Sequence, residues 1–262
     1  MMRVSRAEVQ AGQLKPRTLA LALRELSDAG FVVLEKVLDR ALVDAVRTAF
    51  RSHFDQHCQK PEVRQHIDLG KKYVGMHVPF APPFSDVSLC ANPLAAQVMR
   101  AAMGDDLVCS FYHSNTTLPG SSEFQTIHID MPSLLFPGFP VALPPWLMVV
   151  NIPLIDFTPE NGGTEVWPGT HLNSDERALA ERHSAIPSVR VTARAGDLVI
   201  RDLRLWHRGA PNLTTDIRTM LAIVYNRPWF HMPPPALQIP RAIWDGMSDS
   251  ARRIFRENNI VG

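Results

Sequence analysis

The chain has 262 residues, of which 45% are hydrophobic and 20% are charged, and its formal net charge is +1. These values are ordinary for a globular protein that buries a full core, and they exclude wholesale disorder. The basic residues are scattered along the chain, which argues against binding to nucleic acid. No apolar run is long enough to span a bilayer and no signal-peptide core follows residues 1–6, so we expect a cytoplasmic protein with no membrane partner.

The cysteines are Cys58, Cys90 and Cys109. Their odd number and wide spacing suit neither a disulfide framework nor a cysteine-based zinc site. We expect them to be reduced and mostly buried.

Helical patterns dominate the first hundred residues, after a segment, 1–16, that shows little periodicity and is expected to be a loosely held terminus. Apolar residues at helical spacing, capping residues and a short β-branched run indicate the elements from residue 18 onward. The predicted elements are a helix from Thr18 that ends at Gly30, a strand over 31–34, a helix capped by Asp39 that runs past Phe54, and a helix over 92–103 that ends at Gly104.

Between residues 59 and 86 the periodicity dissolves, and residues 70–84 combine turn-forming residues with bulky apolar ones. One interpretation is a lid or pocket wall that touches substrate through Tyr73, Met76, Phe80 and Phe84. The other is an irregular segment packed on the core. A second candidate lid is the proline-rich stretch within 132–145, which contains Phe136.

Strand signals replace helical ones after residue 105. Short β-prone runs separated by Gly and Pro predict an antiparallel sandwich or barrel. The predicted strands are 107–112, 126–129, 146–152, Val166, 189–192, 198–200 and 219–225, followed by a proline-rich turn and a short helix around 248–257.

His128 and Asp130 lie two residues apart in an apolar, β-branched run, so their side chains are expected on one face of a strand. Two histidines and one carboxylate form the facial triad that leaves open positions on non-haem Fe(II), and His207 is the candidate third ligand. Taken alone, either histidine is better explained as an ordinary residue, His128 in the core and His207 in a loop. His171 is a rival third ligand, whereas His77, His113 and His231 are expected to be packing or surface residues.

Arg218 lies at the start of an apolar strand, where an unpaired guanidinium is costly to bury and therefore needs an anion. An internal salt bridge to Asp197, Asp202 or Asp216 would satisfy this need. A ligand carboxylate would satisfy it as well, because the planar fork of arginine matches a carboxylate in a bidentate manner.

Together these segments resemble the phytanoyl-CoA dioxygenase family of Fe(II)- and 2-oxoglutarate-dependent oxygenases. The resemblance covers about residues 20–228, and most closely 125–225. It rests on Gln125-Thr-Ile-His128-Ile-Asp130, the segment 158–171 between the two histidines, Gly196 to His207, and the His207-Arg-Gly-Ala-Pro-Asn212 turn.

The resemblance implies a mainly β fold with flanking helices (α+β), built on a double-stranded β-helix, the jelly roll of the cupins. We expect one domain over residues 1–262, with N-terminal helices at about 18–103, the jelly-roll core at about 105–228 and a C-terminal extension over 229–262.

The resemblance also assigns roles to residues of the site. His128, Asp130 and His207 would hold Fe(II), and Arg218 would bind the C5 carboxylate of 2-oxoglutarate. Gln125 would contact the C1 end of the cosubstrate, and Thr164 would add a hydroxyl. His171 is rejected as a ligand, since the ligand of the family precedes the Gly-x-Pro-Asn turn as His207 does.

Three further residues before His207, namely Asp202, Arg204 and Trp206, are candidates for orienting its ring. Gly209 is a departure from the family, since some relatives carry Ser there as an extra carboxylate contact, and this weakens the analogy to phytanoyl-CoA hydroxylation itself. Asp130 disfavours halogenation, because halogenating relatives have a small residue in its place.

The activity implied is oxidation of a small or medium apolar organic molecule, such as a natural-product scaffold, with O₂ as oxidant and release of succinate and CO₂. Hydroxylation is the leading reaction, and desaturation, epoxidation and cyclisation remain open. The expected partner is a small-molecule substrate, and the protein is expected to be a monomer or homodimer. A non-catalytic jelly-roll sensor or carrier that holds metal and a carboxylate is the alternative.

Overall fold

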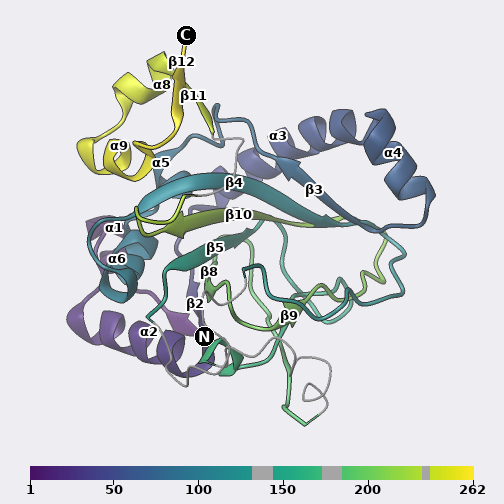
Figure 1. Cartoon of the computed structure of the whole chain (residues 1–262), viewed down its shortest axis with the longest axis horizontal. Helices are drawn as coiled ribbons and strands as arrows, with labels where there is room; N and C mark the ends of the chain where they lie inside the picture. The colour runs from purple at the N-terminus through teal and green to yellow at the C-terminus, as the bar shows by residue number, and fades with distance from the viewer. Residues whose placement is uncertain (132–143, 173–184, 232–236) are drawn as a thin grey trace.

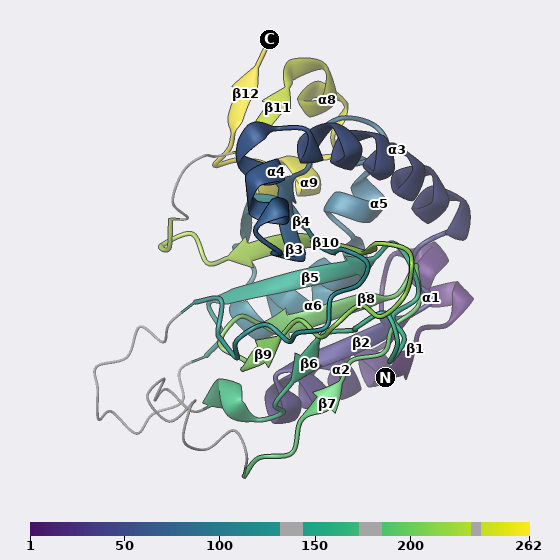
Figure 2. The same cartoon turned by 90° about the vertical axis from the view of Figure 1, so that its right-hand side faces the viewer.

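The structure, a computed structural model, describes residues 1–131, 144–172, 185–231 and 237–262 (Figures 1 and 2). A large mixed sheet runs through the middle of the molecule, with helices packed on one of its faces and a small sheet facing the other. The large sheet has the strand order β1-β2-β8-β5-β10-β4-β3, and the small sheet has the order β7-β6-β9. This arrangement confirms the expected sheet-dominated jelly roll with flanking helices.

The strands of the large sheet are antiparallel except for the edge pair β1 and β2. Their bounds are β1 Met2–Arg3, β2 Phe31–Glu35, β3 Tyr73–His77, β4 Val108–Thr117, β5 Leu147–Pro153, β8 Leu198–Asp202 and β10 Arg218–Asn226. Alternate residues of each strand point to opposite faces. Leu221 and Ile223 of β10 therefore join the core under the helices, whereas Arg218 and Met220 face the small sheet.

The small sheet consists of three two-residue strands, β6 Glu165–Val166, β7 Val189–Arg190 and β9 His207–Arg208. The expected strand over 126–129 is reduced to an isolated bridge between His128 and His207. Two mutual backbone hydrogen bonds, each 3.0 Å, hold this bridge together. It places the two histidines side by side although 79 residues separate them in the sequence.

The helices under the large sheet begin and end where the sequence predicts. Helix α2 (Pro16–Ala29) ends at Gly30, whose left-handed φ of 82° suits glycine. Helix α3 (Arg40–Cys58) is capped by Asp39 and α6 (Pro93–Met103) by Asn92, both through side-chain oxygens that accept backbone N–H groups. Their apolar faces close one continuous core against the sheet.

The expectation of a loosely held N-terminus is wrong. Strand β1 pairs with β2, and α1 (Arg6–Ala11) begins with a capping box in which Ser5 and Glu8 bond reciprocally. The Glu8 carboxylate also accepts the backbone N–H of Lys15, and Leu14 is buried. So short a helix has too few residues to show apolar periodicity in the sequence. Its stability comes mostly from these contacts.

The irregular segment expected over residues 59–86 contains ordered elements, α4 (Pro61–Asp68) and β3, and α5 (Val87–Cys90) follows it. Strand β3 pairs along the edge of β4, so its residues alternate between the two faces. Met76 and Phe80, expected to contact substrate, lie in the main core with 5% of each exposed. That expectation is therefore wrong for both residues, and for this part of the segment the interpretation of packing on the core holds.

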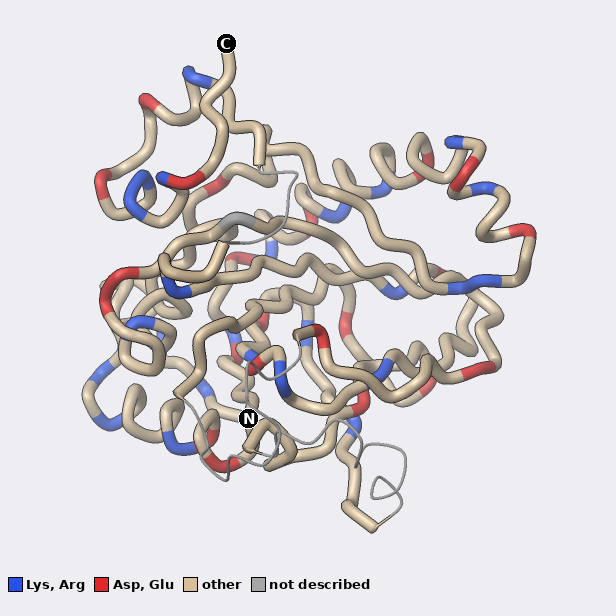
Figure 3. Tube along the Cα trace, in the orientation of Figure 1, with Lys and Arg blue, Asp and Glu red and all other residues tan. Residues whose placement is uncertain are grey.

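The chain ends in helices α8 (Arg241–Gly246) and α9 (Asp249–Phe255), with β11 (Gln238–Pro240) paired to β12 (Asn259–Val261). Helix α9 confirms the predicted terminal helix. Cys90 and Cys109 are buried, Cys58 is half-buried, and none of the three is in a disulfide. Among the described residues, no helix is long and apolar enough to cross a membrane. Figure 3 shows acidic and basic residues interspersed over the trace.

Candidate metal and anion site

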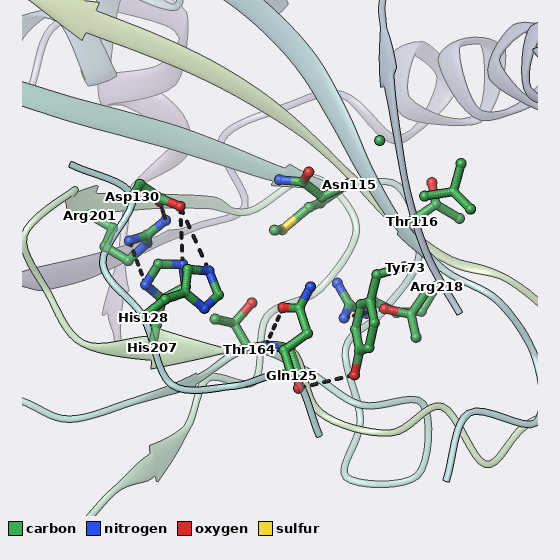
Figure 4. Close-up of a pocket in the computed structure, with 15 residues that line it drawn as sticks. Tyr73, Asn115, Thr116, Gln125, His128, Asp130, Thr164, Arg201, His207 and Arg218 are labelled. Atoms are coloured by element: carbon green, nitrogen blue, oxygen red, sulfur yellow. Dashed lines mark hydrogen bonds and ion pairs between the residues drawn. The ribbon is translucent and has the colours of Figure 1, made fainter. Parts of the chain in front are cut away.

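A cavity of about 240 Å³ lies between the two sheets, and polar side chains from both converge on it (Figure 4). His128, Asp130 and His207 lie at one end, and Arg218 and Tyr73 lie at the other. Between them the wall is formed by Gln125, Thr164, Asn115, Thr116, Thr117, Gly209, Met220, Arg201, Val74 and Gly75. The sequence-predicted site residues thus meet in one pocket, except for Met76, Phe80 and Phe84, which lie in the core, and Phe136, which lies outside the described residues.

The three candidate ligands present one donor atom each to a common point. The donor atoms of His128, Asp130 and His207 all lie within 4.8 Å of one another. Asp130 Oδ1 is 3.5 Å from His207 Nε2 and 3.9 Å from His128 Nε2. Two imidazoles and a carboxylate gathered on one side match the ligand preference of Fe(II) and leave the pocket side open.

Backbone carbonyls fix the orientation of both imidazole rings. His128 Nδ1 lies 2.8 Å from the carbonyl oxygen of Thr126, and His207 Nδ1 lies 3.0 Å from that of Leu205. A carbonyl only accepts, so Nδ1 of His128 carries the proton and its Nε2 lone pair is directed toward Asp130, as a metal ligand requires. At His207 the Arg201 Nη1 donor also lies 3.2 Å from Nδ1, so the two contacts fix the position of the ring with Nε2 toward Asp130.

The surroundings of the triad favour the deprotonated forms of Asp130 and His207. Burial opposes ionisation of Asp130, but the neighbouring His207 and Arg201 outweigh it and hold the pKa of Asp130 well below its usual range. Burial and the Arg201 guanidinium lower the pKa of His207. A metal ligand must be deprotonated to bind a divalent cation, so both shifts favour metal binding.

Arg201, on β8, is a site residue that the sequence reasoning missed. Its side chain is 5% exposed, and Nη2 donates a 2.6 Å hydrogen bond to Asp130 Oδ2. The signal that could have found it is the one that found Arg218, a charged residue within an apolar strand. The two flanking residues, Ile200 and Asp202, face away from the site, as alternation along a strand requires.

The three residues expected to orient His207 do not do so. Asp202 forms a buried pair with Arg204, whose Nε and Nη2 donate at 2.9 and 2.6 Å. Trp206 packs with Trp167 in a separate cluster. The carbonyl of Leu205 takes this role, with Arg201 Nη1 3.2 Å from the same Nδ1. The expectation failed because neighbouring residues in the sequence point to opposite sides of the backbone.

Arg218, at the start of β10, is 2% exposed, and its charge has no ion-pair partner in the described part of the chain. Nη2 donates to the hydroxyl of Thr117 at 2.6 Å, the guanidinium carbon lies 5.2 Å from the centre of the Phe157 ring, and Nε has no hydrogen bond. Burial lowers the pKa of Arg218 to about 10, which leaves it charged at neutral pH.

Each of the internal partners considered for Arg218 is engaged elsewhere. Asp197 accepts the backbone N–H groups of Lys36 and Arg194, Asp202 pairs with Arg204, and Asp216 pairs with Arg51 at 3.1 Å. An internal salt bridge is therefore excluded for all three. The guanidinium instead faces the pocket with donors to spare.

Gln125, Gly209 and Tyr73 form a hydrogen-bonded unit in the middle of the pocket. Gln125 Oε1 accepts the Gly209 N–H at 2.8 Å, which identifies its NH₂ group as the end free to donate to a ligand. The Tyr73 hydroxyl donates to the carbonyl of Gly209 at 3.1 Å. A Cβ at position 209 would lie 2.5 Å from Tyr73 Cε1, so the aromatic ring fills the space that a serine side chain would need.

The other histidines in the described part of the chain do not line the pocket. His171, in the short 3-10 helix Thr170–Leu172, bonds the carbonyl of Ser27 at 3.1 Å and packs under Gly30, so its rejection as a ligand agrees with the structure. His231 is exposed beside Glu257. His77 and His113 lie on the sheet face next to the pocket, where their rings contact each other.

A jelly roll with a His-Asp-His cluster and a buried, unpaired arginine in one pocket defines the class of the non-haem dioxygenases. Residues 26–220 match the family described as phytanoyl-CoA dioxygenase. The chain belongs to this family, which confirms the resemblance seen in the sequence.

Individual relatives agree with this assignment. "Dioxygenase af480" of Aspergillus fumigatus is 29% identical over 180 residues, which are 66% of this chain and 55% of that protein. The chain thus spans little more than half the length of this relative. "Dioxygenase olcK" of Penicillium canescens is 24% identical over 243 residues, which are 88% of this chain and 78% of that protein.

A solved structure with the same fold is that of SnoN, a non-haem alpha-ketoglutarate-dependent epimerase from nogalamycin biosynthesis. It matches with a TM-score of 0.59 and 18% identity, over 81% of this chain and 82% of SnoN. A second SnoN structure contains Fe³⁺, alpha-ketoglutarate and nogalamycin RO, and matches with a TM-score of 0.57 and 19% identity, over 81% of this chain and 85% of that one.

Proposed function

We propose that this protein is an Fe(II)- and 2-oxoglutarate-dependent oxygenase that oxidises a small or medium apolar organic molecule of the natural-product type. The observation that carries the proposal is the division of one pocket into two ends. One end holds three neutral or anionic metal donors, and the other holds a buried cation without a counter-ion. A metal-chelating dicarboxylate is a ligand that satisfies both ends at once.

The metal end fits Fe(II) by its donor chemistry. His128 and His207 would bind through Nε2 and Asp130 through Oδ1, because Nδ1 of each histidine and Oδ2 of the aspartate already have partners. Nitrogen and carboxylate donors of this kind suit iron in preference to softer metals. SnoN, which shares the fold, contains Fe³⁺ and alpha-ketoglutarate in its solved complex, and this supports the same cofactors here.

The opposite end fits the distal carboxylate of 2-oxoglutarate. The unpaired Arg218 fork would hold the C5 carboxylate, with the hydroxyl of Thr117 beside it. The NH₂ group of Gln125 and the hydroxyl of Thr164 line the space between the two ends, where the cosubstrate would lie. With a carboxylate bound, the buried guanidinium gains the counter-charge that it otherwise lacks.

The sheet face beside the pocket supports an apolar, flat substrate. Tyr73 and Gly75 line the pocket, so His77, two residues further along β3, lies on the same face. Phe111 and His113 follow on β4, with ring centres 5.2 Å apart and nearly parallel planes, and His77 meets His113 edge-on at 4.8 Å. Burial and the neighbouring His77 lower the pKa of His113 to about 4, so the His113 ring of this wall is uncharged at neutral pH.

When held by the residues of this pocket, iron and 2-oxoglutarate would supply the oxidising chemistry, with O₂ as the oxidant and succinate and CO₂ as by-products. The protein itself positions the metal, the cosubstrate and the substrate relative to one another. Arg218 and Gln125 fix the cosubstrate, the two imidazoles and Asp130 fix the metal, and the aromatic wall orients the substrate beside it. Whether the oxidised carbon is hydroxylated, desaturated or cyclised then depends on which substrate atom this wall presents.

The test is anaerobic reconstitution with Fe(II) and 2-oxoglutarate, followed by addition of O₂ and measurement of succinate. We expect slow release without substrate, faster release with flat polycyclic compounds, and no release from the His207→Ala protein. Tight binding of metal and 2-oxoglutarate without succinate across a broad compound panel would contradict the proposal and favour the sensor or carrier function.

A further inference from the structure

We propose that Arg201 is a positioning residue that holds Asp130 in a monodentate orientation and thereby keeps one metal position open for O₂. This inference rests on the proposed function and concerns the same site. Arg201 itself has no place among the three metal donors.

The geometry assigns the two carboxylate oxygens of Asp130 to different partners. Oδ1 faces the Nε2 atoms of the two histidines at 3.5 and 3.9 Å, whereas Oδ2 accepts the Nη2 hydrogen bond of Arg201 at 2.6 Å. A hydrogen bond between two charged groups at this distance is among the stronger ones in proteins. It competes directly with any second bond from Oδ2 to the metal.

Arg201 is well placed to hold this orientation because it cannot easily move. It is 5% exposed on a central strand of the large sheet, between β2 and β5. Asp130, in contrast, lies in a segment without regular strand pairing and has 36% of its side chain exposed. The more constrained partner therefore orients the less constrained one.

The orientation matters because of the number of positions around Fe(II). Three protein donors and a bidentate 2-oxoglutarate leave one of six positions free. A carboxylate that bound through both oxygens would take that last position. Without Arg201, we therefore expect Asp130 to compete with the oxidant for the metal.

The test measures nitric oxide, a stable substitute for O₂, on the anaerobic protein loaded with Fe(II) and 2-oxoglutarate, by electron paramagnetic resonance. In the Arg201→Met protein we expect the affinity for nitric oxide to fall by about 10- to 100-fold, the range by which loss of an outer-shell partner lowers metal affinity or activity. Arg201→Lys keeps one charged donor and should give an intermediate loss. The affinity for 2-oxoglutarate should change much less.

The matched control is Arg204→Met, which also breaks a buried arginine–aspartate pair but does not line the pocket. It should lower the melting temperature and leave nitric oxide binding unchanged. If nitric oxide binds equally well to the wild-type and Arg201→Met proteins, the inference on Arg201 is wrong. If the wild-type protein binds neither Fe(II) nor 2-oxoglutarate, the proposed function itself fails.

Discussion

The two ends of the pocket differ in whether their buried charges have partners within the protein. At the metal end, Arg201 and Asp130 form a 2.6 Å ion pair and both histidines have backbone partners, so the buried charges are balanced within the protein. At the other end, Arg218 is equally buried but has only a hydroxyl and the face of an aromatic ring. The charges of the metal end are balanced without a ligand, whereas the charge of Arg218 is balanced only when an anion binds.

This contrast separates structural charges from binding charges. A buried pair such as Arg204 with Asp202 contributes to the fold, because removing either partner leaves the other uncompensated. An unpaired buried charge opposes folding through its desolvation and is retained for what it binds. The two kinds of arginine should therefore respond oppositely to the same substitution.

The largest effect is expected at the triad. His128→Ala, Asp130→Ala and His207→Ala should each abolish coupled turnover, since each removes one of three metal donors. Asp130→Ala should also lower the melting temperature more than His128→Ala, because it leaves Arg201 without its counter-ion. Product analysis after iron removal and readdition, with melting curves alongside, checks both points, and near-normal turnover in any variant would remove that residue from the ligand set.

Arg218→Met is expected to have the second largest effect, and it is the most direct test of the difference between the two ends of the pocket. Removing one partner of a buried charge pair costs on the order of 3–5 kcal/mol, so the 2-oxoglutarate requirement should rise roughly 100- to 1,000-fold. Without cosubstrate, the melting temperature should stay the same or rise, because the wild-type charge is unpaired.

Succinate formation against 2-oxoglutarate concentration measures the first effect of Arg218→Met, and a melting curve of the ligand-free protein measures the second. Arg204→Met serves as the control, with a lower melting temperature and an unaltered cosubstrate curve. A strongly destabilised Arg218→Met protein with normal 2-oxoglutarate dependence would show that this arginine is structural after all.

Gly209→Ser tests the close packing in the middle of the pocket. Its Cβ would lie 2.5 Å from Tyr73 Cε1 and 2.7 Å from Gln125 Oε1, so Tyr73 must shift. Overpacking of this kind costs about 1–3 kcal/mol, read as a lower free energy of unfolding. Tyr73→Ala should relieve most of the penalty in the double variant, and Gly246→Ser, where a Cβ meets nothing within 4 Å, is the control. Simple additivity of the two changes would argue against the contact.

The smallest effect is expected from His113 on the aromatic wall. Because burial lowers its pKa to about 4, the unfolded chain binds a proton between pH 6.5 and pH 4 that the folded protein does not. The titration of His113 therefore leaves the free energy of unfolding unchanged above pH 6.5 and decreases it as the pH falls from 6.5 toward 4. Between pH 7 and pH 5.5 the loss should be roughly 1 kcal/mol.

Burial also lowers the pKa of His171 and of His207, so the wild-type protein must be compared with His113→Gln. Urea unfolding at the two pH values should show a smaller pH dependence for the variant by that amount. Parallel curves for the two proteins would mean that His113 is protonated freely in the folded state.

The sequence alone determined whatever depends on residues close together in the chain. Helix α3 begins at Asp39, α2 ends at Gly30, and the strand with Arg218 has its expected apolar character, because caps and periodicity act over a few residues. The same reasoning identified a metal-binding pattern in His128, Asp130 and His207, and a charge in need of an anion at Arg218.

Only the tertiary structure decided which partner each buried group has. Arg201 meets Asp130 across 71 residues of sequence, and Tyr73 fills the space beside Gly209 across 136 residues. Met76 lies in the core because β3 pairs with β4 in one particular register, and Phe80, which follows β3, is buried in the same core. Strand order was decided only by the tertiary structure, because most neighbouring strands of the large sheet lie far apart in the sequence.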